Sequence, residues 1–310
     1  MPRARVGSVE LYYEDSQPPR GGAAGGAGQG ASARPTRPTL LMIMGLGAQL
    51  VLWPDALCEG LVMRGFRVIR FDNRDVGKST RLDHLGKPDV RREMLRWGLG
   101  RSLSPPYSLE AMADDAAGLL TALGVARAHV MGASMGGMIA QLLAIRHPRR
   151  VASLTSIMSH PGDRRSGVPL PRGLRALLHP APRTREQAQE AMVGFQRVVG
   201  SPGFPVDERS IRDRAGRAFD RGPSPAGLAR QMVAVMAAGD RRPALRALSL
   251  PALVVHGVDD PLVRVVGGER TAAALRNSRL MRIPGMGHDL PQGMWPRLYA
   301  GLADVTGVGG

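Results

Sequence analysis

The stretch Ala128–Ala140, AHVMGASMGGMIA, decides the fold of this chain. It contains the pattern Gly-x-Ser-x-Gly with Ser134 at its centre, between an apolar run and a run of small and apolar residues that reaches Ile145. A chain with 40 glycines can contain this pattern by chance, but the context predicts a strand, a sharp turn and a helix. Gly132 and Gly136 would let strand and helix approach closely, and the turn would expose the side chain between them. Ser134 is therefore a candidate nucleophile, at a helix N-terminus that favours an anion.

Length and cysteine content limit the class of protein. With 310 residues, 43% of them hydrophobic, the chain can form one large domain or a core with a smaller module. Cys58 is the single cysteine, which excludes an internal disulfide and fits a reducing compartment. No apolar run reaches the roughly 18 residues of a membrane span, and the N-terminus has no apolar stretch of secretory length. We therefore expect a cytoplasmic protein without a membrane span.

The net charge of +16 is the second feature that bears on partners. Lys78 and Lys87 are the only lysines among 42 basic residues, so 42 − 2 leaves 40 arginines, and these are scattered along the chain. Nucleic-acid binding would favour a clustered basic surface, with aromatic side chains for stacking on bases, and the chain has 12 aromatic residues. We interpret the charge as a compositional bias towards arginine and expect no nucleic-acid partner.

Apolar runs typical of buried strands alternate with helical patterns over the first half of the chain. The expected strands are 39–44, 67–71, 128–131 and 151–158, and the expected helices are 53–64, 108–123 and the segment after Ser134. Residues 6–13 predict an edge strand, residues 18–38 a flexible loop, and residues 80–108 an irregular segment. The alternation predicts an α/β fold with a mostly parallel sheet and helices on both faces.

The pattern changes after residue 160 and returns near residue 250. Residues 161–245 are rich in proline and arginine, and their apolar segments have helical spacing. Strand patterns then return at 251–256 and 278–283, with helices near 267–276 and 295–305. We predict a first core part at 1–160, a helical cap at 161–245 and a second core part at 246–310.

A serine hydroxyl needs a base to take its proton, and the base needs a third group to orient it. His288 lies in the loop after the expected strand 278–283, and Asp260 lies in the loop after 251–256. Both loops should open at the carboxyl edge of the sheet, where Ser134 is also expected. We predict Ser134, Asp260 and His288 as the catalytic residues. Asp259 and Asp163 remain alternative acids.

The sequence also offers backbone donors for an oxyanion. The tetrahedral intermediate of acyl transfer needs two convergent N–H groups, which Met135 and Leu46 can supply. Leu46 lies in the glycine loop with Gly45 and Gly47, which we expect to contact the substrate together with Met286. The histidines show no metal-ligand spacing with cysteine or carboxylate residues, so we predict no metal and no cofactor.

Five stretches together carry a resemblance to a known family. They are Gly45-Leu46-Gly47, FDNRDVGKS at 71–79, GASMGG at 132–137, HGVDDP at 256–261 and GMGH at 285–288. The chain resembles the α/β-hydrolase superfamily and within it is similar to the aclacinomycin methylesterase type of small esterase, over about 39–160 and 250–305. The order Ser134, Asp260, His288 agrees with this family. Met44 departs from it, since many members have histidine there, but the expected donor is a backbone group.

The residues and the resemblance together predict a serine hydrolase. It would cleave a small-molecule carboxylic ester through an acyl-enzyme on Ser134. The same three residues could instead cleave a lactone, an amide or a carbon–carbon bond, or perform cofactor-free perhydrolysis, because the fold does not select the reaction. A binding protein on a hydrolase scaffold is the alternative from another class.

Overall fold

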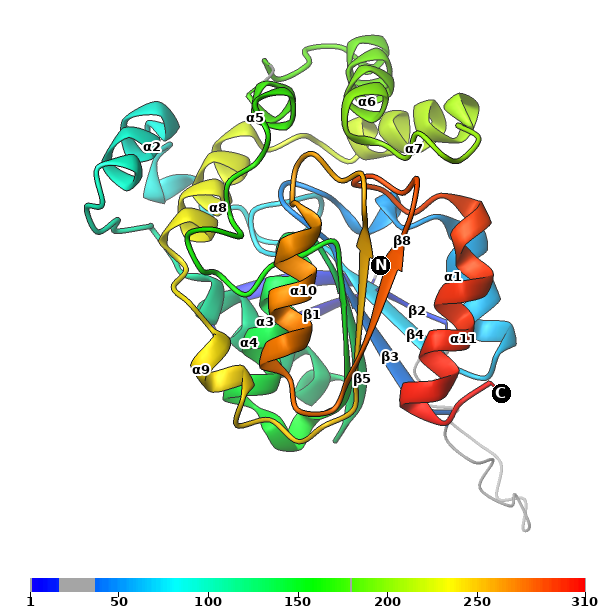
Figure 1. Cartoon of the computed structure of the whole chain (residues 1–310). Coiled ribbons are helices and arrows are strands. Elements are labelled where there is room, and N and C mark those ends of the chain that lie inside the picture. The colour runs from blue at the N-terminus through cyan, green and yellow to red at the C-terminus, as the bar shows by residue number, and fades with distance from the viewer. Residues whose placement is uncertain (1, 17–36, 179, 310) are drawn as a thin grey trace, which may run out of the picture.

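The fold is an eight-stranded sheet covered by helices on both faces, seen in a computed structural model that describes residues 2–16, 37–178 and 180–309 (Figure 1). The strand order is β1-β2-β4-β3-β5-β6-β7-β8, and β1 and β2 alone run antiparallel to their neighbours. The strands are β1 (Arg3–Val6), β2 (Val9–Asp15), β3 (Thr39–Ile43), β4 (Arg67–Phe71), β5 (Ala128–Ala133), β6 (Val151–Ile157), β7 (Ala252–Gly257) and β8 (Ser278–Ile283). The prediction of a mostly parallel sheet is confirmed, while the flexible loop expected at 18–38 lies almost wholly outside the described residues.

Helices form one layer on each face of the sheet (Figure 1). One layer contains α3 (Leu109–Ala122), α4 (Met135–Arg146) and α10 (Val265–Ala274), and the other contains α1 (Asp55–Met63) and α11 (Trp295–Thr306). The five residues of β3 are all buried, as a strand covered on both faces requires. The apolar side chains of the two faces form two separate hydrophobic clusters, one under each helical layer. Within the described ranges, no helix combines the length and apolarity needed to cross a bilayer.

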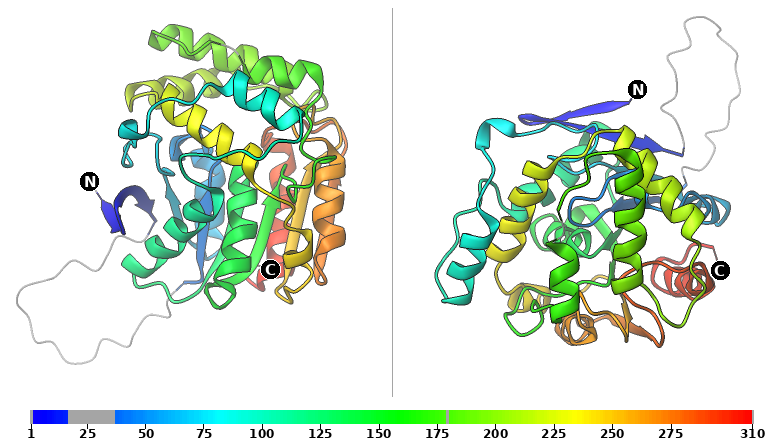
Figure 2. Two further views of the ribbon diagram at one scale, coloured as in Figure 1. Left: turned by 90° about the vertical axis from the view of Figure 1, so that its left-hand side faces the viewer. Right: turned by 90° about the horizontal axis from the view of Figure 1, so that it is seen from above.

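A helical segment between β6 and β7 lies over the carboxyl ends of the strands (Figures 1 and 2). Its helices are α5 (Pro171–Leu177), α6 (Arg185–Val199), α7 (Glu208–Asp220), α8 (Pro225–Ala237) and α9 (Arg242–Leu245). The four longer helices cover this edge, whereas α9 returns the chain to the sheet beside α10. Any site at the carboxyl edge of the sheet is therefore covered by this helical segment.

The structure differs from the sequence-based expectations at three places. A hairpin replaces the single strand expected at 6–13, because Gly7 adopts φ 55° and reverses the chain between β1 and β2. Residues 80–108 are not wholly irregular, since they contain α2 (Val90–Gly98), whose N-cap Asp89 accepts the N–H of Arg92. Helix α1 begins two residues later than expected, after Pro54. Figure 2 shows α2 beside α8, which it packs against.

Buried ion pairs attach the helical segment to the loop after β4. Arg230 on α8 donates to both carboxylate oxygens of Asp75 at 2.8 and 2.7 Å, and neither side chain has exposed area. Burial opposes ionisation of Asp75, but the guanidinium of Arg230 and the N–H of Leu82 hold the pKa of this carboxyl below its usual value. A second arginine, Arg221, pairs with the buried Asp72 in the same loop. The two ion pairs attach the helical segment to the loop that follows β4.

Replacing Arg230 by methionine is expected to destabilise the protein strongly. The substitution would leave the carboxylate of Asp75 buried without its cationic partner, which costs about 3–5 kcal/mol in the free energy of unfolding. Arg282→Met is the matched control, because Arg282 pairs with Glu269 on the surface and should cost less than about 1 kcal/mol. Urea denaturation measures the free energy of unfolding of both variants. Equal losses would show that the buried ion pair contributes no more to stability than the surface pair.

Candidate active site

Ser134 sits at the sharp turn between β5 and α4. Its backbone has φ 56° and ψ −122°, a conformation that residues with side chains rarely adopt. Its N–H donates to the carbonyl oxygen of Ile157 on β6 at 2.9 Å. A Cβ at Gly132 would collide with the carbonyl of Gly136, and a Cβ at Gly136 would collide with the carbonyl of Ile43. Glycine at both positions thus lets the helix start this close to the strands, and the turn presents Ser134 at the sheet edge.

His288 and Asp260, from the loops after β8 and β7, are hydrogen-bonded to each other. Nδ1 of His288 donates to Oδ2 of Asp260 at 2.7 Å, and Asp260 is 3% exposed. The other carboxylate oxygen accepts the N–H groups of Leu262 and Val263 at 2.8 and 2.9 Å. These donors fix the orientation of the carboxylate. With its proton on Nδ1, neutral His288 carries its lone pair on Nε2, the atom that a general base uses.

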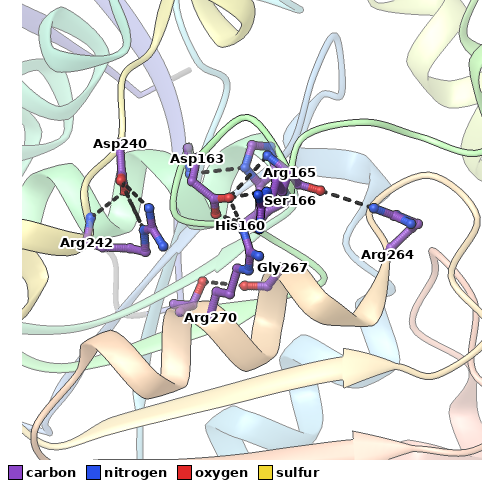
Figure 3. A network of polar contacts seen from close by, with 11 residues as sticks. His160, Asp163, Arg165, Ser166, Asp240, Arg242, Arg264, Gly267 and Arg270 are labelled. Carbon is purple, nitrogen blue, oxygen red and sulfur yellow. Dashed lines mark hydrogen bonds and ion pairs between the residues drawn. The ribbon is translucent and has the colours of Figure 1, made fainter.

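The two alternative acids lie elsewhere. Asp259 accepts a backbone N–H from the loop that follows β8, at 2.8 Å. Asp163 forms an ion pair with Arg270 on α10, as Figure 3 shows. Of the three candidate carboxylates, Asp260 is the one hydrogen-bonded to His288.

The loop that carries His288 is held by the helical segment. The N–H of His288 donates to the carbonyl oxygen of Val199 at the end of α6, at 2.6 Å. The N–H of Gly287 donates to Oγ of Ser201 at 2.9 Å, and the hydroxyl of Ser201 donates to Asp289. Burial raises the pKa of the Asp289 carboxyl, an effect that this hydroxyl opposes. Sequence reasoning missed Ser201, because its partners lie more than 80 residues away.

The glycine loop after β3 runs beside Ser134. A Cβ placed on Gly45 would lie 3.1 Å from Cβ of Ser134 and 3.7 Å from its Oγ. Leu46 follows Gly45 in a turn closed by a 3.2 Å bond from the N–H of Ala48 to the carbonyl of Gly45. In the described part of the chain, the N–H groups of Leu46 and Met135 donate to no other residue. Both groups are therefore available to a ligand.

Helix α8 fixes the other side of this turn. Gly47 has φ 65°, and its N–H donates to Oε1 of the buried Gln231 at 2.8 Å. The amide of Gln231 donates in turn to the carbonyl of Arg74 at 2.9 Å. A Cβ on Gly47 would lie 2.7 Å from Cδ1 of Leu228, so a larger residue there would strain the backbone at this positive φ and displace the side chain of Leu228. No local pattern in the sequence indicates that Gln231 bonds this turn, because its partner Gly47 lies 184 residues away.

A cavity of about 1550 Å³ lies between the sheet edge and the helical segment. Ser134, His288, Gly45 and Gly47 all line it, together with Leu46, Met135 and apolar side chains of α6, α7 and α8. Met286, which we expected to contact the substrate, is not part of this lining. Its side chain has no exposed area and packs in the hydrophobic cluster under α11. The backbone of Met286 lies in the loop that carries His288, but its side chain is directed into the core and not into the cavity. We therefore leave Met286 out of the proposed substrate contacts.

The next feature is the arrangement of side chains that could bind a metal ion. Among the described residues, no group of three or more His, Cys, Asp or Glu side chains is arranged to hold a metal ion. The absence of a metal from the reaction stays a prediction.

Comparison with known proteins defines the class. The chain matches the family model of the alpha/beta hydrolase fold over residues 38–291, and it belongs to this family. It is 28% identical over 297 residues to rhodomycin D methylesterase from Streptomyces peucetius, an alignment that covers 88% of this chain and 92% of that relative. The resemblance to methylesterase-type enzymes is thus confirmed at the level of sequence similarity.

Two further comparisons concern a second relative and the fold. A protein of Caulobacter sp. (strain K31), named as a proposed carbamate hydrolase, is 28% identical over 267 residues, which cover 81% of this chain and 84% of that protein. The structure of a thermophilic esterase from Thermogutta terrifontis superposes with a TM-score of 0.67 at 22% identity, over 98% of both chains, which shows a shared fold. Family, fold and relatives together place the chain among hydrolases.

Proposed function

We propose that the protein is a serine hydrolase that cleaves a carboxylic ester through an acyl-enzyme on Ser134. The observation that carries the proposal is the shared cavity. It is lined by Ser134, at its strained turn, and by His288, whose Nδ1 is held by the buried Asp260. A nucleophile, a base and an orienting carboxylate are the three groups that acyl transfer by serine requires.

The proposed mechanism assigns one role to each group. His288 takes the proton of Ser134 as Oγ attacks the ester carbonyl, and Asp260 stabilises the imidazolium that forms. The N–H groups of Leu46 and Met135 donate to the oxyanion of the tetrahedral intermediate. His288 then protonates the leaving alcohol and, in the second half, activates the water that releases the acid.

The proposed substrate is a small-molecule ester that the helical segment covers. We propose that residues 161–245 act as a cap and that Gly45 and Gly47 form the part of the wall beside the scissile bond. The cavity exceeds the size usual for a drug-sized ligand, which favours a bulky acyl group. The similarity to rhodomycin D methylesterase supports a small alcohol, such as methanol, as the leaving group.

A panel of matched substrates tests the reaction. The proposal predicts that aryl and methyl esters of one carboxylic acid are cleaved with a higher kcat/KM than the corresponding amide, lactone or carbamate. Carbamate hydrolysis is the second candidate, because a relative of similar identity is named for it. A higher kcat/KM for the carbamate would replace the ester assignment and leave the roles of Ser134 and His288 in place.

Removal of the Ser201 hydroxyl is expected to lower kcat with little change in KM. Ser201→Ala would release Gly287 and Asp289, so that the base shifts relative to Ser134. Misplacement by about 1 Å can cost up to roughly 10²-fold in rate. Ser278→Ala is the control, since the hydroxyl of Ser278 bonds the backbone carbonyl of Ala272 at the other end of β8 and the residue does not line the cavity. Steady-state kinetics on one ester test this prediction. Equal kcat values for Ser201→Ala and the wild-type protein would refute the positioning role of Ser201.

A further inference from the structure

His160 is a cavity-lining histidine that the proposed mechanism does not use. It lies in the loop after β6, is 8% exposed and lines the same cavity as Ser134. Its Cβ packs against α10, where a Cβ on Gly267 would lie 2.8 Å away. Figure 3 shows the imidazole among the residues of the loop after β6, beside Asp163 and above Gly267. The side chain is thus fixed at the floor of the cavity.

The contacts of the ring define its tautomer. Nδ1 accepts the N–H of Gly162 at 3.1 Å, so the lone pair lies on Nδ1 and the proton of the neutral ring lies on Nε2. Burial lowers the pKa of His160 to about 3, and the cation of Arg241 acts in the same direction. Arg241 also donates to the carbonyl oxygen of His160 at 2.8 Å, which fixes the backbone. His160 is therefore a neutral donor at every pH at which the protein would be assayed.

The donor on Nε2 has no partner within the described ranges of the chain. The Nε2 edge of the ring is turned towards Gly167, which also lines the cavity, since a Cβ there would lie 3.2 Å from Cε1 and 3.6 Å from Nε2. Two other polar side chains that line this cavity are engaged within the protein, since Gln49 accepts from Arg221 and Asp289 accepts from Ser201. An N–H donor on a cavity wall that bonds no acceptor of the described residues is available to a ligand in that cavity.

The surroundings of His160 indicate what that ligand contact must be. Met138, Met158 and Leu262 line the same cavity with apolar side chains. Binding cavities of this kind use a few placed polar groups to orient an otherwise apolar ligand. A neutral N–H group can donate to a hydroxyl, ether or carbonyl oxygen, and the apolar lining around it disfavours burial of a charged carboxylate there.

We propose that Nε2–H of His160 donates to an ether, hydroxyl or carbonyl oxygen in the part of the substrate that is not cleaved. The inference rests on the proposed function, and it makes His160 a residue that determines substrate specificity. The substrate class then narrows from esters in general to esters whose acyl group carries a neutral oxygen acceptor.

An oxygen scan tests the inference. Aryl esters of straight-chain acids are compared with counterparts in which one methylene, at successive positions, is replaced by an ether oxygen. The wild-type protein should prefer the oxygen at one position by roughly 2- to 10-fold in kcat/KM, the range that one hydrogen bond gives. The preference should be lost in His160→Phe and His160→Leu and retained in part in His160→Gln, which keeps an N–H donor. Since His160 stays neutral, the wild-type preference should not change between pH 5 and pH 9.

Each outcome separates this inference from the proposed function. Two donor-less variants are used, so that the test survives if the phenylalanine ring does not fit. If the wild-type protein cleaves esters through Ser134 but its oxygen preference at every position equals that of both variants, the role of His160 is refuted and the proposed function stands. If the wild-type protein cleaves no ester, the proposed function fails and this inference fails with it.

Discussion

Ser134→Ala is expected to abolish ester turnover. Without Oγ there is no nucleophile in the turn between β5 and α4, and the remaining groups can only polarise the carbonyl and activate water. Loss of a catalytic serine of this kind costs about 10⁶-fold in kcat, while the oxyanion donors keep a small residual rate. Substrate affinity should change little, because alanine preserves the backbone of the turn.

The control for this prediction is Ser278→Ala, at the opposite end of β8. The hydroxyl of Ser278 bonds the carbonyl of Ala272, far from the cavity in sequence and topology. It should keep wild-type kinetics. Hydrolysis of a chromogenic aryl ester by Ser134→Ala at the wild-type rate would mean that another group is the nucleophile.

Asp260→Asn is expected to have the second-largest effect. An amide in place of the carboxylate would present N–H groups or a neutral oxygen to Nδ1 of His288, so the ring loses the partner that sets its tautomer and stabilises its charge. Loss of this function lowers kcat by about 10⁴-fold in triads with unchanged geometry. The backbone bonds from Leu262 and Val263 to the remaining oxygen should preserve the fold.

Asp259→Asn is a closely matched control for that variant. Asp259 precedes Asp260 directly, and its carboxylate accepts the N–H of Gly285, a role that an asparagine oxygen can fill. Its kcat should stay within about threefold of wild type, because a surface contact of this kind contributes little. A greater loss in Asp259→Asn than in Asp260→Asn would exchange the roles of the two carboxylates.

The parts of the fold that could be predicted are those set by local sequence. The turn at Ser134 depends on two glycines within two residues of it, and the buried strands depend on continuous apolar runs such as β3. Ser108 caps α3 by accepting the N–H of Ala111 at 3.3 Å, again a contact within three residues. Such interactions leave a pattern in the sequence that can be recognised without the rest of the chain.

The parts that could not be predicted depend on contacts between distant residues. The side chains of Asp259 and Asp260 have different partners, since Asp259 bonds the N–H of Gly285 and Asp260 bonds Nδ1 of His288. In the sequence, only the neighbouring Pro261 favoured Asp260 as the acid. The bonds of Ser201 to the His288 loop and of Gln231 to the turn at Gly47 join segments 86 and 184 residues apart. Met286 shows the converse error, since a residue next to the site in sequence can point into the core.

Labelling with a fluorophosphonate tests the central claim most directly. Such a reagent phosphonylates a serine only when a neighbouring base activates it, so it reports the nucleophile without knowledge of the substrate. We predict one adduct, located by peptide mass spectrometry on Ser134, that forms on the wild-type protein and far more slowly on Asp260→Asn. An adduct on another residue, or an unmodified Ser134 in folded protein, would contradict the account.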